Sequence, residues 1–377
     1  MDEKILRKAF ALIAKGFVEK EALLKKEPNR YPHSRCLQHG INMFLAASIE
    51  IGKVGKTVWE YADEASFIKK FSELPVADWF DEWDSNVVAQ IHLENEPFFG
   101  FGPLVMWEDE NRYTPSEDCL EYLESQDSDI LAGTDERILY EKMIGLNQEH
   151  YTQIRKFIIR HPIASAEELR NLKKQLIGHP NTIDALNFAY ESWEEETYRC
   201  PVCGWTMTMG KHGVVCHSRY CTEITPDLTE DDKISSDEGS LLRLKKGVMR
   251  YFAQPGKLEL EIADYCQKLE LSYTLWPLMD TYDIEICFPD GEIWEIDAKA
   301  YHNPIALRNK VQDDEAFSRE GFSHGYYVIP SEFVRGQQNY TKIVNQALKK
   351  KDRVQCITST TLKKKIRRKV DQLHEEE

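Results

Sequence analysis

Apolar residues in the first half of the chain recur every three or four positions, which is the period of amphipathic α-helices. Residues 2–26 and 135–160 follow this period most clearly, and the second run stops at a His-Pro pair. Ser165 and Glu168 have the spacing of a capping box, which predicts that another helix begins there. We therefore expect residues 1–195 to form a mostly helical domain.

From about residue 241 the pattern becomes a mixture of short alternating runs and longer helical runs. The alternating runs are typical of strands, and the longer ones of helices. The expected order is helix, three strands, helix, strand, helix, strand, near residues 257–270, 272–276, 282–288, 292–300, 304–318, 325–330, 339–350 and 354–358. This order predicts an α/β domain at the C-terminal end of the chain.

Two of these strands form a hairpin over residues 282–301, YDIEICFPDGEIWEIDAKAY. The tripeptide Pro289-Asp290-Gly291 has the residues that a three-residue turn favours. Such a turn pairs residues whose numbers sum to 580, so acids oppose each other twice, Asp283 with Asp297 and Glu285 with Glu295. Because side chains alternate along a strand, the other face holds the apolar set Ile284, Ile286, Phe288, Trp294, Ile296 and Ala298.

Carboxylates that oppose each other across two strands repel, at a cost of about a few tenths of a kcal/mol or more per pair. A divalent cation between them removes this cost, and oxygen ligands favour Mg²⁺ or Mn²⁺. Lys299 lies two residues beyond Asp297 on the same face. Asp283, Asp297 and Lys299 are therefore candidate catalytic residues for phosphodiester hydrolysis, which requires such groups around a metal ion. An ordinary hairpin with a charged surface is the alternative.

A third carboxylate is expected from the helix before the hairpin. Glu259 has Ile262, Ala263 and Cys266 three, four and seven positions further on, so it lies on the apolar side of that helix. Glu259 is therefore a candidate catalytic residue and a further Mg²⁺ ligand. The alternative is a carboxylate near the helix start that the helix dipole favours.

A cysteine cluster lies between the two halves of the chain. Cys200, Cys203, Cys216 and Cys221 have the spacing C-x₂-C-x₁₂-C-x₄-C, and thiolates at such spacings bind Zn²⁺ tetrahedrally. Four protein ligands leave no open position, so this zinc would be structural. His217 adjoins Cys216 and is an alternative ligand. The other cysteines are scattered and are expected to be buried and inert: Cys36, Cys119, Cys266, Cys287 and Cys356.

The total charge changes the expectation for nucleic acid. The 377 residues include 64 acidic and 48 basic ones, a formal net charge of −16, which disfavours diffuse binding to nucleic acid. Basic residues nevertheless cluster locally, and the candidates for phosphate contacts are Lys245, Lys246, Lys363, Lys364, Lys365, Arg367 and Arg368. The alternative is a solvated basic helix that balances the acidic half of the chain.

The hydrophobic runs are too short for a membrane span, which needs about 20 apolar residues. The N-terminal sequence MDEKILRKAF is charged from its second residue and lacks the apolar stretch of a secretory signal. We therefore expect a cytoplasmic protein without a membrane partner. Cysteines stay reduced there, which favours metal binding over disulfides.

Asp283 and, fourteen positions further on, Asp297-Ala298-Lys299 resemble the Asp…(Asp/Glu)-x-Lys motif of the PD-(D/E)xK nuclease superfamily, which has the restriction-endonuclease-like fold. Tyr282 stands where the family motif has Pro. The literal Pro289-Asp290 lies in the turn and does not match. The resemblance implies Mg²⁺-dependent cleavage of DNA at these residues.

Longer segments narrow the resemblance. A zinc knuckle precedes the runs PGKLELEIADYCQKLEL, LWPLMDTYDIEICFPDG and IWEIDAKAYHNPIAL. Together they resemble the restriction-endonuclease-like protein encoded beside the prokaryotic PIWI-like proteins called pPIWI-RE. This resemblance, over residues 200–350, implies a role in defence against plasmids or phage. The partners it implies are a PIWI/Argonaute-like protein and a DinG-type helicase.

The sequence thus predicts an α+β multidomain protein with a helical N-terminal half. The expected domains are a helical domain at 1–195, a zinc module at 196–225, an acidic linker at 226–242 and a nuclease domain with a basic end at 243–377. The expected function is that of a Mg²⁺-dependent DNA endonuclease. The alternatives are a non-catalytic DNA-binding or adaptor subunit on the same fold, and an RNA-processing nuclease.

Overall fold

The structure is a computed structural model of the chain. The residues it describes are 3–26, 33–52, 61–80, 102–109, 112–126, 135–193, 196–210, 213–216, 218, 221, 228–234, 241–312, 314, 316–317, 321–334, 337 and 339–376. The chain divides into two compact units, which are Met1–Ile130 with Thr208–His217, and Leu131–Met207 with Ser218–Glu377. His217, the alternative zinc ligand, lies outside the described residues.

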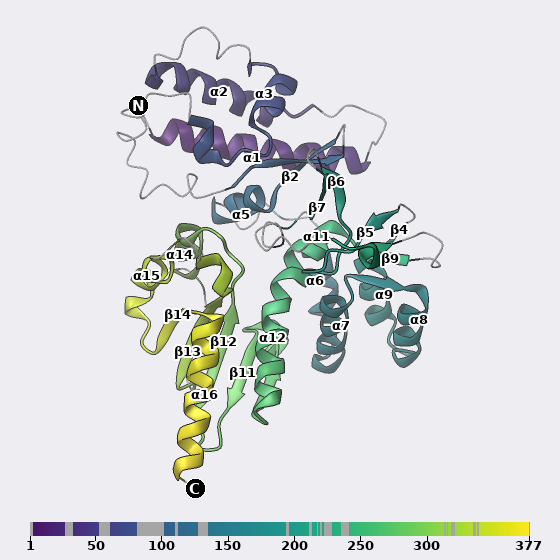
Figure 1. Cartoon of the computed structure of the whole chain (residues 1–377), viewed down its shortest axis with the longest axis vertical. Helices are drawn as coiled ribbons and strands as arrows, with labels where there is room; N and C mark the ends of the chain where they lie inside the picture. Colours follow the sequence, from purple (N-terminus) through teal and green to yellow (C-terminus); the bar gives the residue numbers. More distant parts are fainter. Residues whose placement is uncertain are drawn as a thin grey trace. The chain divides into compact units, whose positions relative to one another are not determined.

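The first unit consists mainly of helices (Figure 1). Aromatic side chains pack between them, since the ring centroid of Phe10 lies 5.6 Å from that of Phe44 and 5.4 Å from that of Trp79. The elements of this unit are α1 (Glu3–Lys26), α2 (Arg35–Gly52), α3 (Glu64–Phe71), η2 (Val76–Phe80), β1 (Val105–Asp109), β2 (Arg112–Pro115), α5 (Glu117–Gln126), β6 (Thr208–Gly210) and β7 (Gly213–Val215). Helix α1 matches the predicted helix at 2–26. It approaches α2 closely, because a Cβ added at Gly16 would lie 2.4 Å from the backbone nitrogen of Leu37.

The second unit begins with helices and short strands. Its first elements are α6 (Asp135–Met143), α7 (Gln148–Arg160), β3 (Ile163–Ser165), α8 (Ala166–Gln175), α9 (Pro180–Ala189), β4 (Tyr190–Trp193), β5 (Thr197–Tyr198), η6 (Glu230–Asp232), β8 (Lys233–Ile234) and β9 (Leu241–Leu244). The capping box is confirmed, since Ser165 and Glu168 exchange both hydrogen bonds at the start of α8. The helical period over 135–160 is divided between α6 and α7, because Asn147 caps α7 by accepting a hydrogen bond from the His150 backbone.

The remaining helical and sheet elements follow the predicted order. They are α11 (Lys246–Val248), the π-helical turn η8 (Met249–Ala253), α12 (Gln254–Lys268), β10 (Ser272–Leu275), the turn α13 (Pro277–Asp280), β11 (Ile284–Cys287), β12 (Ile293–Ala298), α14 (Pro304–Gln312), β13 (His324–Ile329), η9 (Ser331–Val334), α15 (Tyr340–Ala347), η10 (Leu348–Lys350), β14 (Val354–Thr358) and α16 (Ser359–Glu376). All eight predicted elements are present, and α16 extends the chain beyond them.

One five-stranded sheet organises this part of the second unit. The strand order is β10-β11-β12-β13-β14. The pairs β10–β11 and β11–β12 are antiparallel, whereas β12–β13 and β13–β14 are parallel. The helices α14 and α15 therefore lie in the crossovers that parallel strands require.

The predicted register of the hairpin is confirmed. Glu285 pairs with Glu295, and Ile284 with Ile296, which are the pairs that sum to 580. The loop spans residues 289–291, since Phe288 donates its backbone N–H to the carbonyl of Glu292. Gly291 has a φ of 89°, a left-handed conformation that side chains with a Cβ disfavour.

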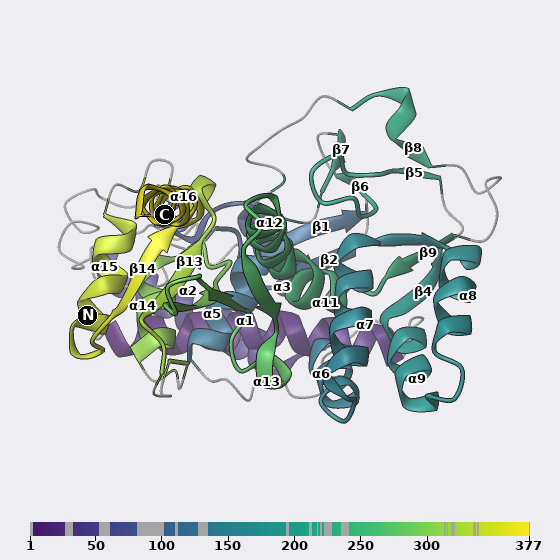
Figure 2. The same cartoon turned by 90° about the horizontal axis from the view of Figure 1, so that it is seen from below.

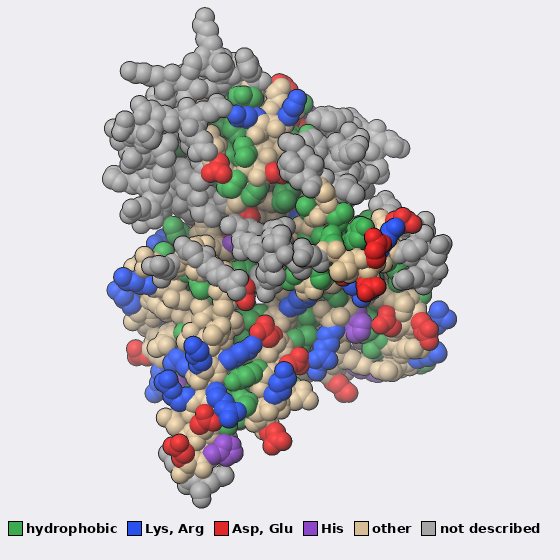
Figure 3. All heavy atoms as spheres, viewed as in Figure 1, with side chains coloured by type: hydrophobic (Ala, Val, Ile, Leu, Met, Phe, Trp, Pro, Cys, Tyr) green, Lys and Arg blue, Asp and Glu red, His purple; other side chains and the backbone are tan. Residues whose placement is uncertain are grey.

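Helices cover the sheet in two groups. Figure 2 shows α12 and α16 together on one side of the strands; these helices contact each other, and between them they contact β11, β12, β13 and β14. The predicted apolar set of the hairpin is buried, each side chain at most 8% exposed: Ile284, Ile286, Phe288, Trp294, Ile296 and Ala298. Lys and Arg side chains gather over the region where α16 lies (Figure 3).

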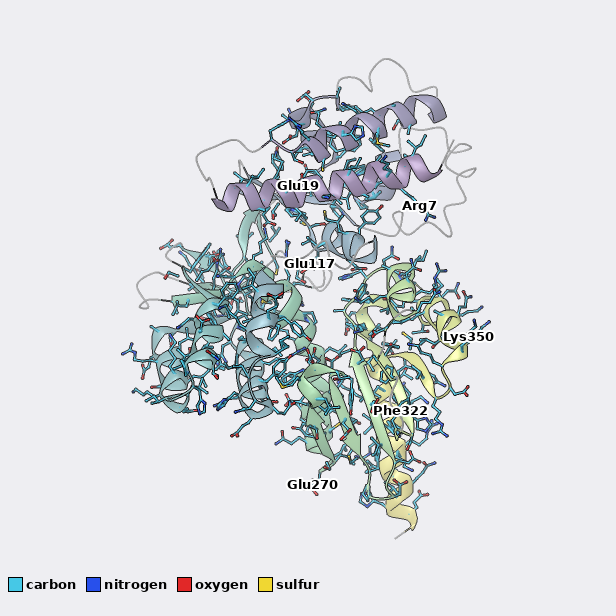
Figure 4. All side chains as sticks on the ribbon, turned by 180° about the vertical axis from the view of Figure 1, so that it is seen from behind. Arg7, Glu19, Glu117, Glu270, Phe322 and Lys350 are labelled. Carbon is cyan, nitrogen blue, oxygen red and sulfur yellow. The ribbon has the colours of Figure 1, made fainter. Side chains whose placement is uncertain are left out.

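A second apolar core involves α14 and α15. It includes Leu307 of α14, Tyr327 of β13 and Val344 of α15, and Phe322, labelled in Figure 4, packs against it. Tyr327 is the register partner of Asp297, so both side chains lie on the same face of the sheet. The acidic face of the hairpin thus continues into a packed core, and Asp297 is only 6% exposed.

The predicted fold class is confirmed in its coarse form, a protein of mixed helix and sheet with a C-terminal sheet and a cysteine cluster. The predicted domain boundaries at 195, 225 and 242 stay predictions. Within the predicted linker, residues 228–234 include η6 and β8, and β8 pairs with β5. Across the described part of the chain, none of the helices combines the length and apolar character that crossing a membrane demands.

Candidate functional site

The two aspartates of the predicted motif lie side by side at the start of β11. Asp283 directly precedes β11 in the same register, and its backbone N–H donates to the carbonyl of Ile296 over 3.0 Å. Its Oδ2 accepts from the backbone N–H of Ala298 over 2.6 Å, and it lies close enough to Asp297 for the charge of that residue to raise its pKa. The structure therefore brings Asp283 and Asp297 together as predicted.

Lys299 points at this pair. Its Nζ lies 2.9 Å from Oδ1 and 2.8 Å from Oδ2 of Asp297. A further carboxylate approaches from the segment after α14, since Asp314 Oδ2 lies 3.9 Å from the same Nζ. Lys299 thus lies beside Asp297 on the same face, as the sequence predicts, and the structure adds the direct ion pair between them.

Burial dominates the electrostatics of the pair. Removal from water raises the pKa of Asp283 well above its usual value, and the nearby Glu259 and Asp297 raise it further. Burial also raises the pKa of Asp297, although Lys299 opposes this shift. Burial disfavours the charged form of Lys299, yet the carboxylates around it keep its pKa above the usual value. Two buried carboxyl groups with raised pKa values are costly to ionise unless a cation binds them.

Glu259 has a partner that the sequence did not indicate. Arg155 of α7 donates to both of its oxygens, over 3.0 and 3.1 Å, and the indole N–H of Trp276 donates to one of them. Burial raises the pKa of Glu259, and Arg155 opposes that shift. The helix-dipole alternative is wrong, because helical backbone already begins at Lys246, well before Glu259. The role of Glu259 as a Mg²⁺ ligand stays a prediction, since its oxygens are engaged by Arg155.

Sequence reasoning missed three charged residues at this site, Arg155, Asp280 and Asp314. Arg155 is 6% exposed, and it hydrogen-bonds Asp280 as well as Glu259. One signal was present, because Arg155 lies among Tyr151, Ile154 and Ile158, the buried side of its helix. A basic residue on the apolar side of a helix indicates a buried anionic partner.

The charges at the site favour a divalent cation. Five carboxyl groups converge here, from Glu259, Asp280, Asp283, Asp297 and Asp314, whereas Arg155 and Lys299 are the cations that contact them. Carboxylate oxygens are the ligands that Mg²⁺ and Mn²⁺ prefer. Asp283 and Asp297 fit this ion best, because they adjoin each other. Arg155 lies 3.8 Å from Asp283, which is beyond hydrogen-bond distance and leaves this carboxylate available to a metal ion.

The four predicted zinc ligands also come together. The sulfur atoms of Cys200, Cys203, Cys216 and Cys221 lie within 4.8 Å of one another, and all four residues are buried. Cys203 lies in a tight turn, in which the backbone N–H of Gly204 donates to the carbonyl of Cys200. Four thiols at this separation fit a tetrahedral zinc ion without an open position.

The predicted phosphate-binding residues fall into three places. Lys363, Lys364, Arg367 and Arg368 line a shallow groove of about 500 Å³ on α16, together with Tyr265 of α12. Lys365 lies instead over the ring of Tyr326, 5.7 Å from its centroid. Lys245 and Lys246 lie elsewhere, at the start of α11, where Lys245 stacks 3.6 Å above the ring of Phe188.

Comparison with known proteins identifies part of the chain. Residues 256–374 match the model of the family described as the REase associating with pPIWI_RE. The match confirms, for this segment, the resemblance to restriction-endonuclease-like proteins associated with pPIWI-RE, and it contains Glu259, Asp283, Asp297 and Lys299. Neither the curated proteins nor the solved structures include a significant match.

Proposed function

We propose that this protein, whose residues 256–374 form a restriction-endonuclease-like domain, is a divalent-metal-dependent nuclease that hydrolyses phosphodiester bonds in DNA. The observation that carries the proposal is the convergence of Asp283, Asp297 and Lys299 at the start of the hairpin. In an ordinary charged surface hairpin, two opposed aspartates would remain in water, because burial of charge is costly. The family match supports a nuclease-like role independently of this geometry.

The two aspartates and the lysine are proposed to have different roles in the hydrolysis. Asp283 and Asp297 would hold Mg²⁺ or Mn²⁺, which supplies positive charge to a phosphate and makes a water molecule more acidic. Lys299 already donates to Asp297, so it presents an N–H donor and a positive charge beside the same position. It is suited to orient the attacking water or to stabilise charge on the phosphate. The buried surroundings strengthen both interactions, because a low dielectric screens them less.

The proposed contact surface for nucleic acid is the groove on α16 of the same domain. The groove on α16 presents four cations, of which Lys363 pairs with Glu261 of α12 and Arg367 pairs with Asp371 over 3.0 Å. Cations spaced along one helix can bind the phosphates of a strand without reading its sequence. DNA is therefore the proposed partner of this groove.

The proposed context follows from the family. The name of the matching family associates its members with pPIWI_RE. We propose that this protein acts in the cytoplasm with a PIWI/Argonaute-like protein and a DinG-type helicase, in defence against plasmids or phage. The cysteine cluster is proposed to hold structural Zn²⁺.

The test is a cleavage assay with the purified full chain. Plasmid, linear duplex DNA and single-stranded RNA are each incubated with Mg²⁺ or with EDTA, alongside Lys299→Ala. Cleavage of DNA that requires Mg²⁺ and Lys299 supports the proposal. Cleavage of RNA alone favours the RNA-processing nuclease, and DNA binding without cleavage under every condition favours the adaptor subunit.

A further inference from the structure

Helix α7 directs three side chains at the segment before the hairpin. Gln148, Tyr151 and Arg155 are three and four residues apart, so they lie along one side of the helix. Each of them contacts residues 276–280, the turn that connects β10 to Asp283. Helix α7 precedes the segment that matches the nuclease family, which begins at residue 256.

The turn at 276–280 has an unusual backbone. Trp276, Leu278, Met279 and Asp280 have φ values of 50°, 55°, 58° and 73°, although none of them is glycine. Side chains with a Cβ disfavour this left-handed conformation, and such residues persist where the surroundings hold them. The turn therefore depends on contacts from outside it.

Gln148 hydrogen-bonds the backbone of the turn at two positions. Its Nε2 donates to the carbonyl of Trp276 over 2.8 Å, and its Oε1 accepts from the backbone N–H of Met279 over 3.0 Å. Tyr151 donates its hydroxyl to Asp280 Oδ2 over 2.9 Å. The turn is also joined to Asp283, because the backbone N–H of its first residue, Trp276, donates to the carbonyl of Asp283 over 2.7 Å.

Arg155 connects the turn to two further carboxylates of the site, Glu259 and Asp283. Its guanidinium contacts Asp280, Glu259 and Asp283, the last over 3.8 Å. The rings of Phe252 and Trp276 lie 4.9 Å from its central carbon. A guanidinium has a planar arrangement of donors that several carboxylates can share, which an ammonium group does not reproduce.

We infer that α7 completes the nuclease site, and that Arg155 is a positioning residue which fixes Asp283 for metal binding. Glu259 then anchors Arg155. This inference rests on the proposed function only in taking Asp283 and Asp297 as the metal ligands. It extends the nuclease beyond residues 256–374, because Gln148, Tyr151 and Arg155, which contact its left-handed turn, lie outside the matched segment.

The experiment measures Mn²⁺ binding to the full-length protein in the absence of nucleic acid, by electron paramagnetic resonance. Arg155→Lys is compared with Arg160→Lys, a control on the same helix. Arg160 also pairs with α12, through Asp264 over 3.1 Å, but its side chain is 46% exposed. We expect the Mn²⁺ dissociation constant to rise about tenfold for Arg155→Lys, the effect of losing a residue that orients a metal ligand, and to stay unchanged for Arg160→Lys. Unchanged or tighter Mn²⁺ binding by a folded Arg155→Lys protein overturns the inference.

Tyr151→Phe provides a milder second variant in case Arg155→Lys does not fold. It removes only the hydroxyl that donates to Asp280, and a smaller rise of the same dissociation constant is expected. An unchanged constant for a folded Tyr151→Phe protein, when Arg155→Lys does not fold, also overturns the inference.

The inference and the proposed function can fail separately. If wild-type protein binds Mn²⁺ through Asp283 but cleaves no nucleic acid, the proposed function fails alone. If wild-type protein cleaves DNA while both variants bind Mn²⁺ normally, the inference fails alone.

Discussion

The cysteine cluster and the aspartate pair are two candidate metal sites of opposite construction. Four buried thiols lie within 4.8 Å of one another, so an ion between them has all its positions filled by the protein. The aspartate pair offers two carboxyl groups, with Lys299 beside them as a donor. The difference predicts that an ion at the first site is structural, whereas an ion at the second keeps coordination positions that the cysteine-type site does not have.

The two sites also differ in how the chain builds them. The cysteines lie within a short stretch of sequence, where backbone turns bring the thiols together. The aspartates come together through two strands in register. A buried arginine and a left-handed turn, which contacts from α7 support, lie beside them. Changes at the first site should therefore affect stability, and changes at the second should affect catalysis.

The largest effect is expected for Asp297→Asn, which keeps the shape of the side chain but removes a charged metal ligand. We expect the rate of DNA cleavage to fall about 100-fold or more, because charge stabilisation of the phosphate is lost. The thermal midpoint should not fall. Glu285→Gln is the matched control, since Glu285 lies on the same strand pair but binds Tyr282. Equal loss of activity in both variants contradicts the distinction between them.

Cys203→Ser is expected to act on stability instead. Loss of one thiolate weakens zinc binding, and zinc binding contributes directly to folding, so the thermal midpoint should fall by roughly 10 °C. Zinc content and the midpoint are measured together, with Cys36→Ser as a control because Cys36 lies outside the cluster. A Cys203→Ser protein of normal stability and zinc content argues against the structural site.

Brief exposure to EDTA should separate the sites in the wild-type protein. An ion at the aspartate pair exchanges readily, whereas a closed site of four thiolates retains zinc. Cleavage should stop, and it should return fully when Mg²⁺ is added, while zinc content stays unchanged. Activity that returns only with added zinc would assign the catalytic role to the cysteine cluster.

The smallest effect concerns the groove on α16. The double variant Lys364→Gln/Arg368→Gln should weaken DNA binding uniformly across sequences. The slope of log binding constant against log salt concentration should become shallower by about 0.9 per charge removed. Lys349 is an exposed lysine of η10 outside the groove, and Lys349→Gln should leave both the affinity for DNA and this slope unchanged. If the Lys349 variant loses as much affinity as the double variant, the groove has no special role.

The sequence by itself determined the local geometry of both sites. A turn of Pro289, Asp290 and Gly291 sets the register of the strands that it joins, so the opposition of Asp283 and Asp297 followed from a few residues. The spacing of the cysteines similarly predicted their cluster. Turn and spacing rules act over short stretches of chain, which is why they could be applied without a structure.

Only the tertiary structure decided which distant groups complete the aspartate site. Arg155 and Glu259 are 104 residues apart, and no local pattern relates them. The close approach of their helices depends on Gly256, where an added Cβ would lie 2.3 Å from Ile159. Burial of the carboxylates and the left-handed turn at 276–280 likewise arise from packing against α7. Such contacts depend on how whole helices pack, and that free energy is not encoded in any short segment.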